Sequence, residues 1–148
     1  MSRIHQGSQQ RKARICAMQM LYQWEMGREE PARVQEMYWR EVRALEPREY
    51  ASKLFEAATS EVAEIDALIT RFARRWKVER LPAVDRNLLR IAITEFRHSP
   101  EVPPAVVINE TIEIAKMFSS DDSYEFLNGV LDAISKDAKE DKNEAKPD

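Results

Sequence analysis

Two segments of the chain carry positive charge against an acidic background, which is the first requirement for a surface that binds a polyanion. Residues 1–28 have a net charge of +4 and residues 71–97 a net charge of +5, whereas the whole 148-residue chain sums to −3. Basic side chains at helical spacing either form a nucleic-acid-binding surface or lie on ordinary solvated helix faces. Charge alone leaves both interpretations open.

Residues for other kinds of chemistry are scarce. Three glycines in 148 residues leave no Gly-rich loop that could hold a phosphate or a dinucleotide. The single cysteine, Cys16, excludes an internal disulfide and a Cys-rich metal site. His5 and His98 have no nearby metal-ligand partner in the sequence, so we expect neither a zinc site nor another metal centre.

The sequence also has no segment that suggests a membrane or secretion. No run of residues approaches the ~20 apolar positions that span a bilayer, and the first ten residues lack the apolar core of a signal peptide. A lone thiol fits a reducing compartment. We therefore expect a cytoplasmic protein without a membrane association.

Apolar residues recur at helical spacing along nearly the whole chain, which predicts an all-α fold. Proline, glycine and polar turn signals divide it into about seven helices, over residues 8–26, 32–44, 48–59, 62–75, 83–97, 105–118 and 123–135. We expect one helical domain over residues 8–136, built from two packed helical bundles at about 8–76 and 82–136. A flexible tail is expected before it, over residues 1–7, and a disordered acidic tail after it, over residues 137–148.

The helix over residues 8–26 has two apolar stripes on nearly opposite sides. One fits the core, and the second consists of Ile15, Met18 and Tyr22, with Arg11 one turn before it on the same side. A helix with two such stripes is either enclosed in its own fold or contacts a partner. The basic residue on the second side favours the partner.

The helix over residues 83–97 is expected to be amphipathic. Arg86, Arg90 and Arg97 fall on one outward arc, while Glu95 lies within the apolar arc and should need an ionic or hydrogen-bonding partner. In the last helix the apolar period continues across Gly129, which predicts a close helix–helix contact there rather than a hairpin turn.

Four motifs, in order, resemble the NusB family of bacterial transcription antitermination factors. They are Arg11-Lys12-Ala13-Arg14 with Leu21-Tyr22-Gln23-Trp24, then Val84-Asp85-Arg86 with Leu88-Leu89-Arg90, then Val107-Ile108-Asn109-Glu110, and finally Phe126-Leu127-Asn128-Gly129-Val130-Leu131-Asp132. Each motif is weak alone. Together they cover about residues 11–134, and their order makes the resemblance specific.

The resemblance implies a non-enzymatic protein without a cofactor. It implies binding to the single-stranded boxA element of nascent ribosomal RNA together with NusE, which is also a ribosomal small-subunit protein. Through that complex it implies an indirect association with the other Nus factors and RNA polymerase, which suppresses early termination of ribosomal RNA transcripts.

The resemblance also implies which residues bind. The family's arginine-rich motif corresponds to Gln10 through Arg14, where Gln10 departs from the frequent arginine. The positions implied for RNA contact are Arg11, Lys12, Arg14, Arg90, Asp122, Ser123 and Phe126. Tyr22 and Asp85 match the family's positions for contacting NusE, and the stripe that includes Tyr22 adds Met18. Phe126 either stacks on an unpaired base or simply packs in the core, and Asp122 also fits a helix N-cap.

Two other functions remain open from the sequence. A similar helical domain forms the N-terminal part of some ribosomal RNA methyltransferases, although this chain has no Gly-rich cofactor-binding segment. A helical protein-interaction bundle that uses the second stripe and binds no RNA is the other alternative. A homodimer that covers the basic surface is also compatible with the sequence.

Overall fold

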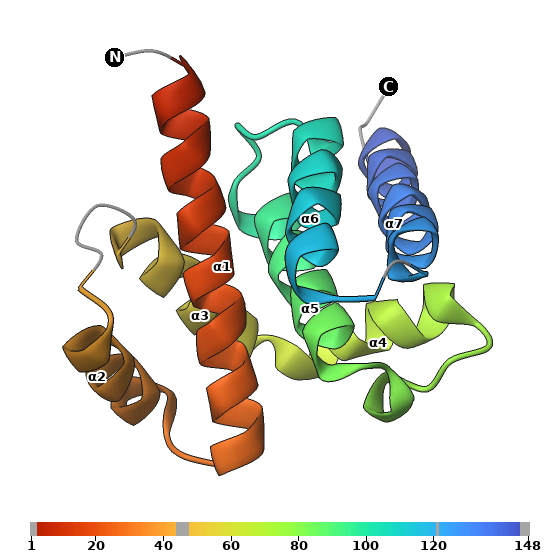
Figure 1. Ribbon diagram of the computed structural model, residues 1–148. Helices are drawn as coiled ribbons and strands as arrows, with labels where there is room; N and C mark the ends of the chain where they lie inside the picture. The colour runs from red at the N-terminus through yellow and green to blue at the C-terminus, as the bar shows by residue number, and fades with distance from the viewer. Residues whose placement is uncertain (1–2, 44–47, 121, 146–148) are drawn as a thin grey trace.

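The computed structural model describes the backbone of residues 3–43, 48–120 and 122–145, and the side chains of residues 10–43, 48–120 and 122–138. The described part contains seven α-helices and one short 3-10 helix (Figure 1). In chain order these are α1 (Arg3–Gly27), α2 (Pro31–Glu41), α3 (Arg48–Ser60), α4 (Val62–Ala73), η1 (Val78–Arg80), α5 (Ala83–His98), α6 (Pro104–Phe118) and α7 (Ser123–Ala145).

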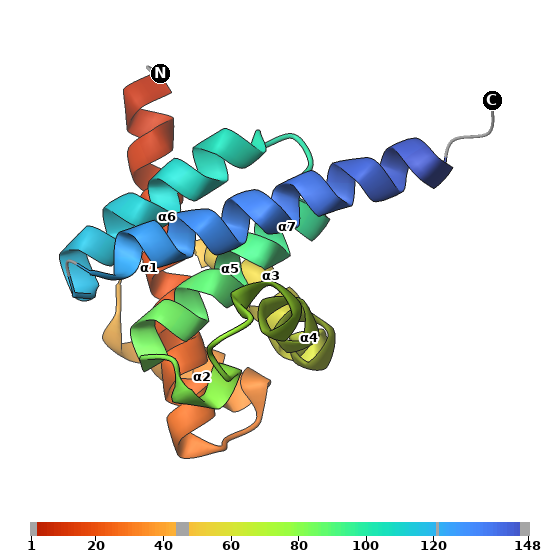
Figure 2. The ribbon, with the colours of Figure 1, turned by 90° about the vertical axis from the view of Figure 1, so that its right-hand side faces the viewer.

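Helix α5 is the centre of the molecule, and the expected all-α fold is confirmed. It packs against α1, α3, α4, α6 and α7, so both halves of the chain share it. Helices α1, α2 and α3 form one group beside it, and α6 and α7 run antiparallel on its other side (Figures 1 and 2). The two bundles are therefore joined through a common helix rather than separated by a seam.

Proline and a left-handed residue define several helix ends. Pro31 and Pro104 occupy the first turns of α2 and α6, where a missing N–H costs nothing. Helix α1 ends at Gly27, but the residue with positive φ is Arg28, at 56°. The backbone N–H of Arg28 donates to the Trp24 carbonyl at 3.0 Å. The position that would favour glycine is thus one residue later than the glycine itself.

The terminal helices are longer than expected. Helix α1 begins at Arg3 instead of about Ser8, and α7 continues to Ala145 instead of ending near Ser135. The expected tails are therefore helical over residues 3–7 and 137–145, while residues 1–2 and 146–148 lie outside the described residues. The part of α7 beyond Ser135 is rich in lysine and glutamate, which are good helix formers.

Two expectations about helix faces are wrong. Every residue of α5 from Asp85 to Glu95 is buried, including Arg86 and Arg90, because five helices pack against it. Of the three arginines on the expected outward arc, only Arg97 is exposed. A Cβ placed at Gly129 would meet no atom within 4 Å, so this glycine is exposed and makes no close helix–helix contact.

Candidate nucleic-acid interface

Among the α1 side chains that the structure describes, from Gln10 onward, the exposed or partly exposed basic residues are Arg11 and Lys12. The Arg11 side chain is 40% exposed, and its Nε donates to Glu110 Oε2 of α6 at 2.6 Å. Lys12 is exposed on the same helix. Both cations are accessible from solvent, and Arg11 is held in place by a carboxylate that a phosphate could displace.

Arg14 does not share this surface. Its side chain is 1% exposed, and its guanidinium donates to both carboxylate oxygens of Glu95, at 2.6 and 2.9 Å. Tyr50 Oη donates to the same carboxylate at 2.8 Å. Burial alone would lower the pKa of Arg14, but the hydrogen bond and charge of Glu95 outweigh burial and raise that pKa. Arg14 is thus the partner that Glu95 was expected to need, and Glu95 neutralises its charge inside the fold. The expected contact of Arg14 with an RNA phosphate stays a prediction, and in this structure its guanidinium is not accessible to one.

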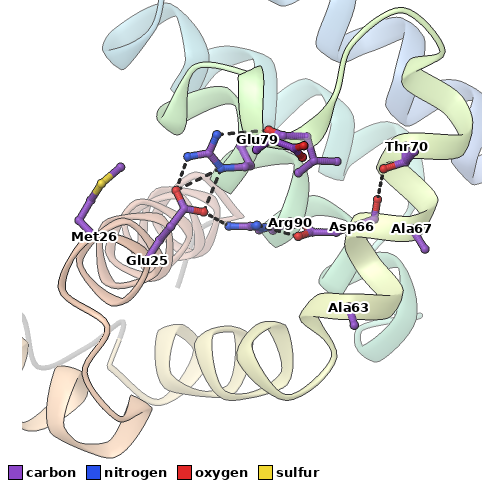
Figure 3. Close-up of a pocket in the computed structure, with 10 residues that line it drawn as sticks. Glu25, Met26, Ala63, Asp66, Ala67, Thr70, Glu79 and Arg90 are labelled. Carbon is purple, nitrogen blue, oxygen red and sulfur yellow. Dashed lines mark hydrogen bonds and ion pairs between the residues drawn. The ribbon is translucent and has the colours of Figure 1, made fainter.

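Arg90 is also removed from the surface, by a network of carboxylates shown in Figure 3. Its Nε and Nη2 donate to Asp66 of α4 at 2.9 and 2.8 Å, and its Nη1 donates to Glu25 of α1. Arg86 donates to Glu25 as well, and its Nη1 donates to the Leu81 carbonyl at 2.7 Å. In Figure 3 the Arg90 guanidinium lies between Glu25 and Asp66, with the charges balanced locally. Arg90 is only 6% exposed, so in this structure its guanidinium is not open to RNA, and the expected RNA contact at this residue stays a prediction.

The same network shifts the pKa of its members. Burial alone would raise the pKa of the Glu25 carboxyl, but hydrogen bonds from Arg86 and Arg90 hold it below its ordinary value. Burial alone would lower the pKa of Arg90, and the contacts with Asp66 and Glu25 raise it. A hollow of about 540 Å³ lies beside the network, and Met26, Ala63 and Glu79 are among its lining residues. The network fixes α1, α4 and α5 to one another.

Asp85 and Ser123 are likewise structural. Asp85, at the start of α5, is 2% exposed and accepts hydrogen bonds from Ser123 Oγ at 2.7 Å and from Ser119 Oγ. The two serines flank the turn between α6 and α7. The expected partner contact at Asp85 and the expected RNA contact at Ser123 stay predictions. Both side chains are enclosed in this structure. Their bonds position the turn that presents Asp122.

Asp122 and Phe126 lie at the outer side of that turn. Asp122 is exposed, and Phe126 is half-buried. The ring of Phe126 meets Trp76 edge to face, with 6.4 Å between centroids. Trp76 is 53% exposed and was not among the site residues predicted from the sequence. A tryptophan between basic residues in a connector is a sequence pattern that could have indicated it.

A groove lies beside Tyr22, on the second stripe of α1. It encloses about 440 Å³ and is lined by Met18, Gln19, Tyr22, Gln23, Tyr38, Glu41, Val42, Val84 and Phe118. Tyr22 and Phe118 are 42% and 43% exposed. Met18 is only 3% exposed and is among the residues that line the groove, and the partner contact expected of it stays a prediction.

Along α6, Glu110 and Phe118 are eight residues apart, which corresponds to about 12 Å of helix. Helix α6 therefore carries the ion pair with Arg11 toward one end and the edge of the groove at the other. The fold brings a basic surface, an acidic and aromatic turn, and an apolar groove onto neighbouring elements.

Clusters of metal ligands and membrane-spanning helices are both absent from the part of the chain that the structure describes. No group of three or more histidine, cysteine, aspartate or glutamate side chains in that part could hold a metal ion. None of its helices is long and apolar enough to cross a membrane.

These features define an all-helical protein whose surfaces suit binding. The sequence model of the NusB family matches residues 11–136, and the chain belongs to that family. Among curated relatives, the transcription antitermination protein NusB of Koribacter versatilis is 46% identical over 129 residues, which are 86% of this chain and 88% of the relative. The protein of the same name from Sorangium cellulosum is 39% identical over 122 residues, covering 82% and 87%.

Solved structures agree with the fold. NusB of T. maritima superimposes with a TM-score of 0.79 at 34% identity, covering 86% of this chain and 90% of that one. A chain from a crystal structure of the antitermination factors NusB and NusE in complex with dsRNA superimposes with a TM-score of 0.76 at 30% identity, covering 92% and 98%.

Proposed function

We propose that this protein is an RNA-binding transcription antitermination factor, which binds the boxA element of nascent ribosomal RNA together with NusE in the cytoplasm. It acts by binding, without catalysis and without a cofactor. The observation that supports this most is the likeness to the solved NusB–NusE–dsRNA complex over 92% of the chain. The match with these two curated antitermination proteins covers 88% and 87% of their length, which favours this function over a methyltransferase domain.

On the RNA side, Arg11 and Lys12 bind phosphates, because they are the accessible cations of the arginine-rich motif. Asp122 lies next to the RNA path and weakens binding through repulsion of phosphate. Phe126 contributes an aromatic surface at the same turn. Arg14, Arg90 and Ser123 support these residues from inside the fold.

On the protein side, NusE docks over the groove beside Tyr22, where Phe118 offers a second exposed aromatic side chain. Phe118 precedes Ser119, and Ser119 and Ser123 both bond to Asp85. NusE that contacts Phe118 therefore touches the turn that presents Asp122. NusE that docks beside this turn extends the surface that the RNA follows, so we expect binding of NusE and RNA to be positively coupled.

The test is binding of a short single-stranded boxA RNA at two salt concentrations, with and without NusE. Arg11→Ala should weaken binding and lower the salt dependence by roughly one phosphate contact, a slope change of about 0.7 for a single strand. Asp122→Asn should tighten binding. Arg33→Ala, which removes an exposed charge from α2, is the matched control and should leave affinity unchanged.

A helical protein-interaction bundle remains the second candidate, because the groove beside Tyr22 is apolar and open. NusE binding that is insensitive to salt, with no retention of RNA under any condition, would establish that function instead and exclude the RNA-binding one.

A further inference from the structure

The connector between α4 and α5 exposes the large apolar side chain of a tryptophan to solvent. Trp76 is 53% exposed, the largest aromatic side chain among the exposed apolar residues of the described part. Its only aromatic neighbour there is Phe126, and the two rings meet edge to face. The two rings are not stacked face to face, and about half of the Trp76 side chain remains open to solvent, so ring surface is available for stacking with a ligand.

Phe126 connects this platform to the turn between α6 and α7. It lies in the first turn of α7, three residues after Ser123 and four after Asp122. The turn is fixed from below by Ser123 and Ser119 on Asp85. A ligand that follows the turn past Asp122 therefore reaches Phe126 and then Trp76.

The charge around Trp76 is positive. Residues 74–80 contain four basic side chains and the single acid Glu79, and the four cations are exposed: Arg74, Arg75, Lys77 and Arg80. No carboxylate among the described side chains lies within ion-pair distance of any of them.

The remaining arginines of the second basic segment behave differently. Arg86 and Arg90 are paired with Glu25 and Asp66, and Arg97 lies 2.6 Å from Glu64. The connector is thus the part of this segment whose charge stays available. Free cations beside an exposed ring match a single-stranded nucleic acid, whose backbone is anionic and whose bases stack.

We propose that Trp76 stacks on an unpaired RNA base and that Arg75 and Lys77 bind the neighbouring phosphates. The site extends the RNA path from the turn at Asp122 onto the connector between α4 and α5. It rests on the proposed function, because the same RNA must first bind at Arg11 and Lys12. A protein partner at this site would require an apolar surface wider than one ring, and its binding would depend little on salt.

The test measures RNA affinity for Trp76→Ala, Trp76→Phe and the wild-type protein in the presence of NusE. Loss of one stacked base should weaken binding about tenfold in Trp76→Ala, with an unchanged salt slope. Trp76→Phe should retain most of the affinity. Met37→Ala, which removes an exposed apolar side chain from α2, is the matched control and should bind as the wild type does.

A series of RNAs, each with one abasic position, distinguishes stacking from a structural role of Trp76. If the role were only structural, the affinity difference between wild type and Trp76→Ala would be the same for every RNA. At one position, loss of the base should abolish the difference between wild type and Trp76→Ala. At other positions the difference should persist. Thermal unfolding of each variant checks that the fold is intact.

Equal affinity of Trp76→Ala and wild type, while Arg11→Ala still weakens binding, overturns the platform and leaves the proposed function standing. A tenfold loss that is the same with every abasic RNA also overturns it, since it indicates a structural effect. Failure of the wild-type protein to bind any boxA RNA overturns the proposed function instead.

Discussion

The arginines of α1 and those of α5 have opposite fates, although both helices carry them at similar spacing. Arg86 and Arg90 of α5 are enclosed and neutralised by carboxylates from other helices. Arg11 of α1 stays 40% exposed with one carboxylate partner. The difference follows from position in the fold: five helices pack against α5 and bury Arg86 and Arg90, whereas Arg11 of α1 stays partly exposed beside α6. A basic segment predicts a binding surface only where the fold leaves it a solvated face.

Arg14 sharpens the comparison most, because it belongs to the arginine-rich motif by sequence and to the core by position. Arg14→Ala should lower the free energy of unfolding by about 3–5 kcal/mol, since it leaves the Glu95 carboxylate buried without its cation. Urea unfolding measures the effect. Arg40→Ala removes an exposed pair with Glu36 and should change stability by less than about 0.5 kcal/mol. Equal effects of the two variants would contradict the burial of Arg14.

Arg90 and Arg11 should separate stability from binding. Arg90→Ala removes contacts with two carboxylates, so we expect a loss of about 1–3 kcal/mol in stability. At a temperature where the variant is folded, its RNA affinity should equal that of the wild type. Arg11→Ala should show the reverse pattern. Weak RNA binding by folded Arg90→Ala would place Arg90 on the RNA path after all.

The acid limb of stability tests the network around Glu25. Its pKa is lowered in the folded state, so the stabilisation is present above the unfolded-state pKa of about 4.3 and is lost as pH falls through the folded-state value. Stability of the wild-type protein should therefore decrease below about pH 4–5. Glu25→Gln should be less stable at neutral pH and should show a shallower decrease. Parallel pH profiles of the two proteins would argue against an ionised Glu25 in the network.

The smallest effect is expected at Glu110. Glu110→Gln releases Arg11 from its ion pair, so RNA binding should tighten by about twofold to fivefold, as expected for a partly exposed pair. The variant Glu113→Gln, on the same helix and exposed, controls for the change in net charge. If both variants tighten binding equally, the gain reflects long-range charge and not competition for Arg11.

Much of the fold could be predicted from the sequence because helix signals are local. The bounds of α3, α5 and α6 lie within two residues of those expected, since proline and apolar spacing act over a few positions. The end of α7 was missed because the loss of apolar residues was taken as disorder, whereas Lys136 pairs with Asp132 along the helix and Asp137 lies 3.5 Å from Arg71 of α4.

The site could be predicted only in part. Arg11, Lys12 and Tyr22 are accessible as expected. The burial of Arg14 was not predicted because its partner, Glu95, lies 81 residues away, and the helical period of α1 carries no information about which acid will meet it. The same reason applies to Arg90, whose carboxylates come from α1 and α4.

The buried ion pairs between α1 and α5 also bear on the order in which the chain folds. Glu95 and Arg86 lie 81 and 61 residues after their partners on α1, and contacts of such sequence separation slow folding. During synthesis, which proceeds from the N-terminus, α1 leaves the ribosome long before α5 exists. Arg14 therefore has no partner until most of the chain has been made. Its buried ion pair with Glu95 can stabilise the protein only when synthesis has passed residue 95.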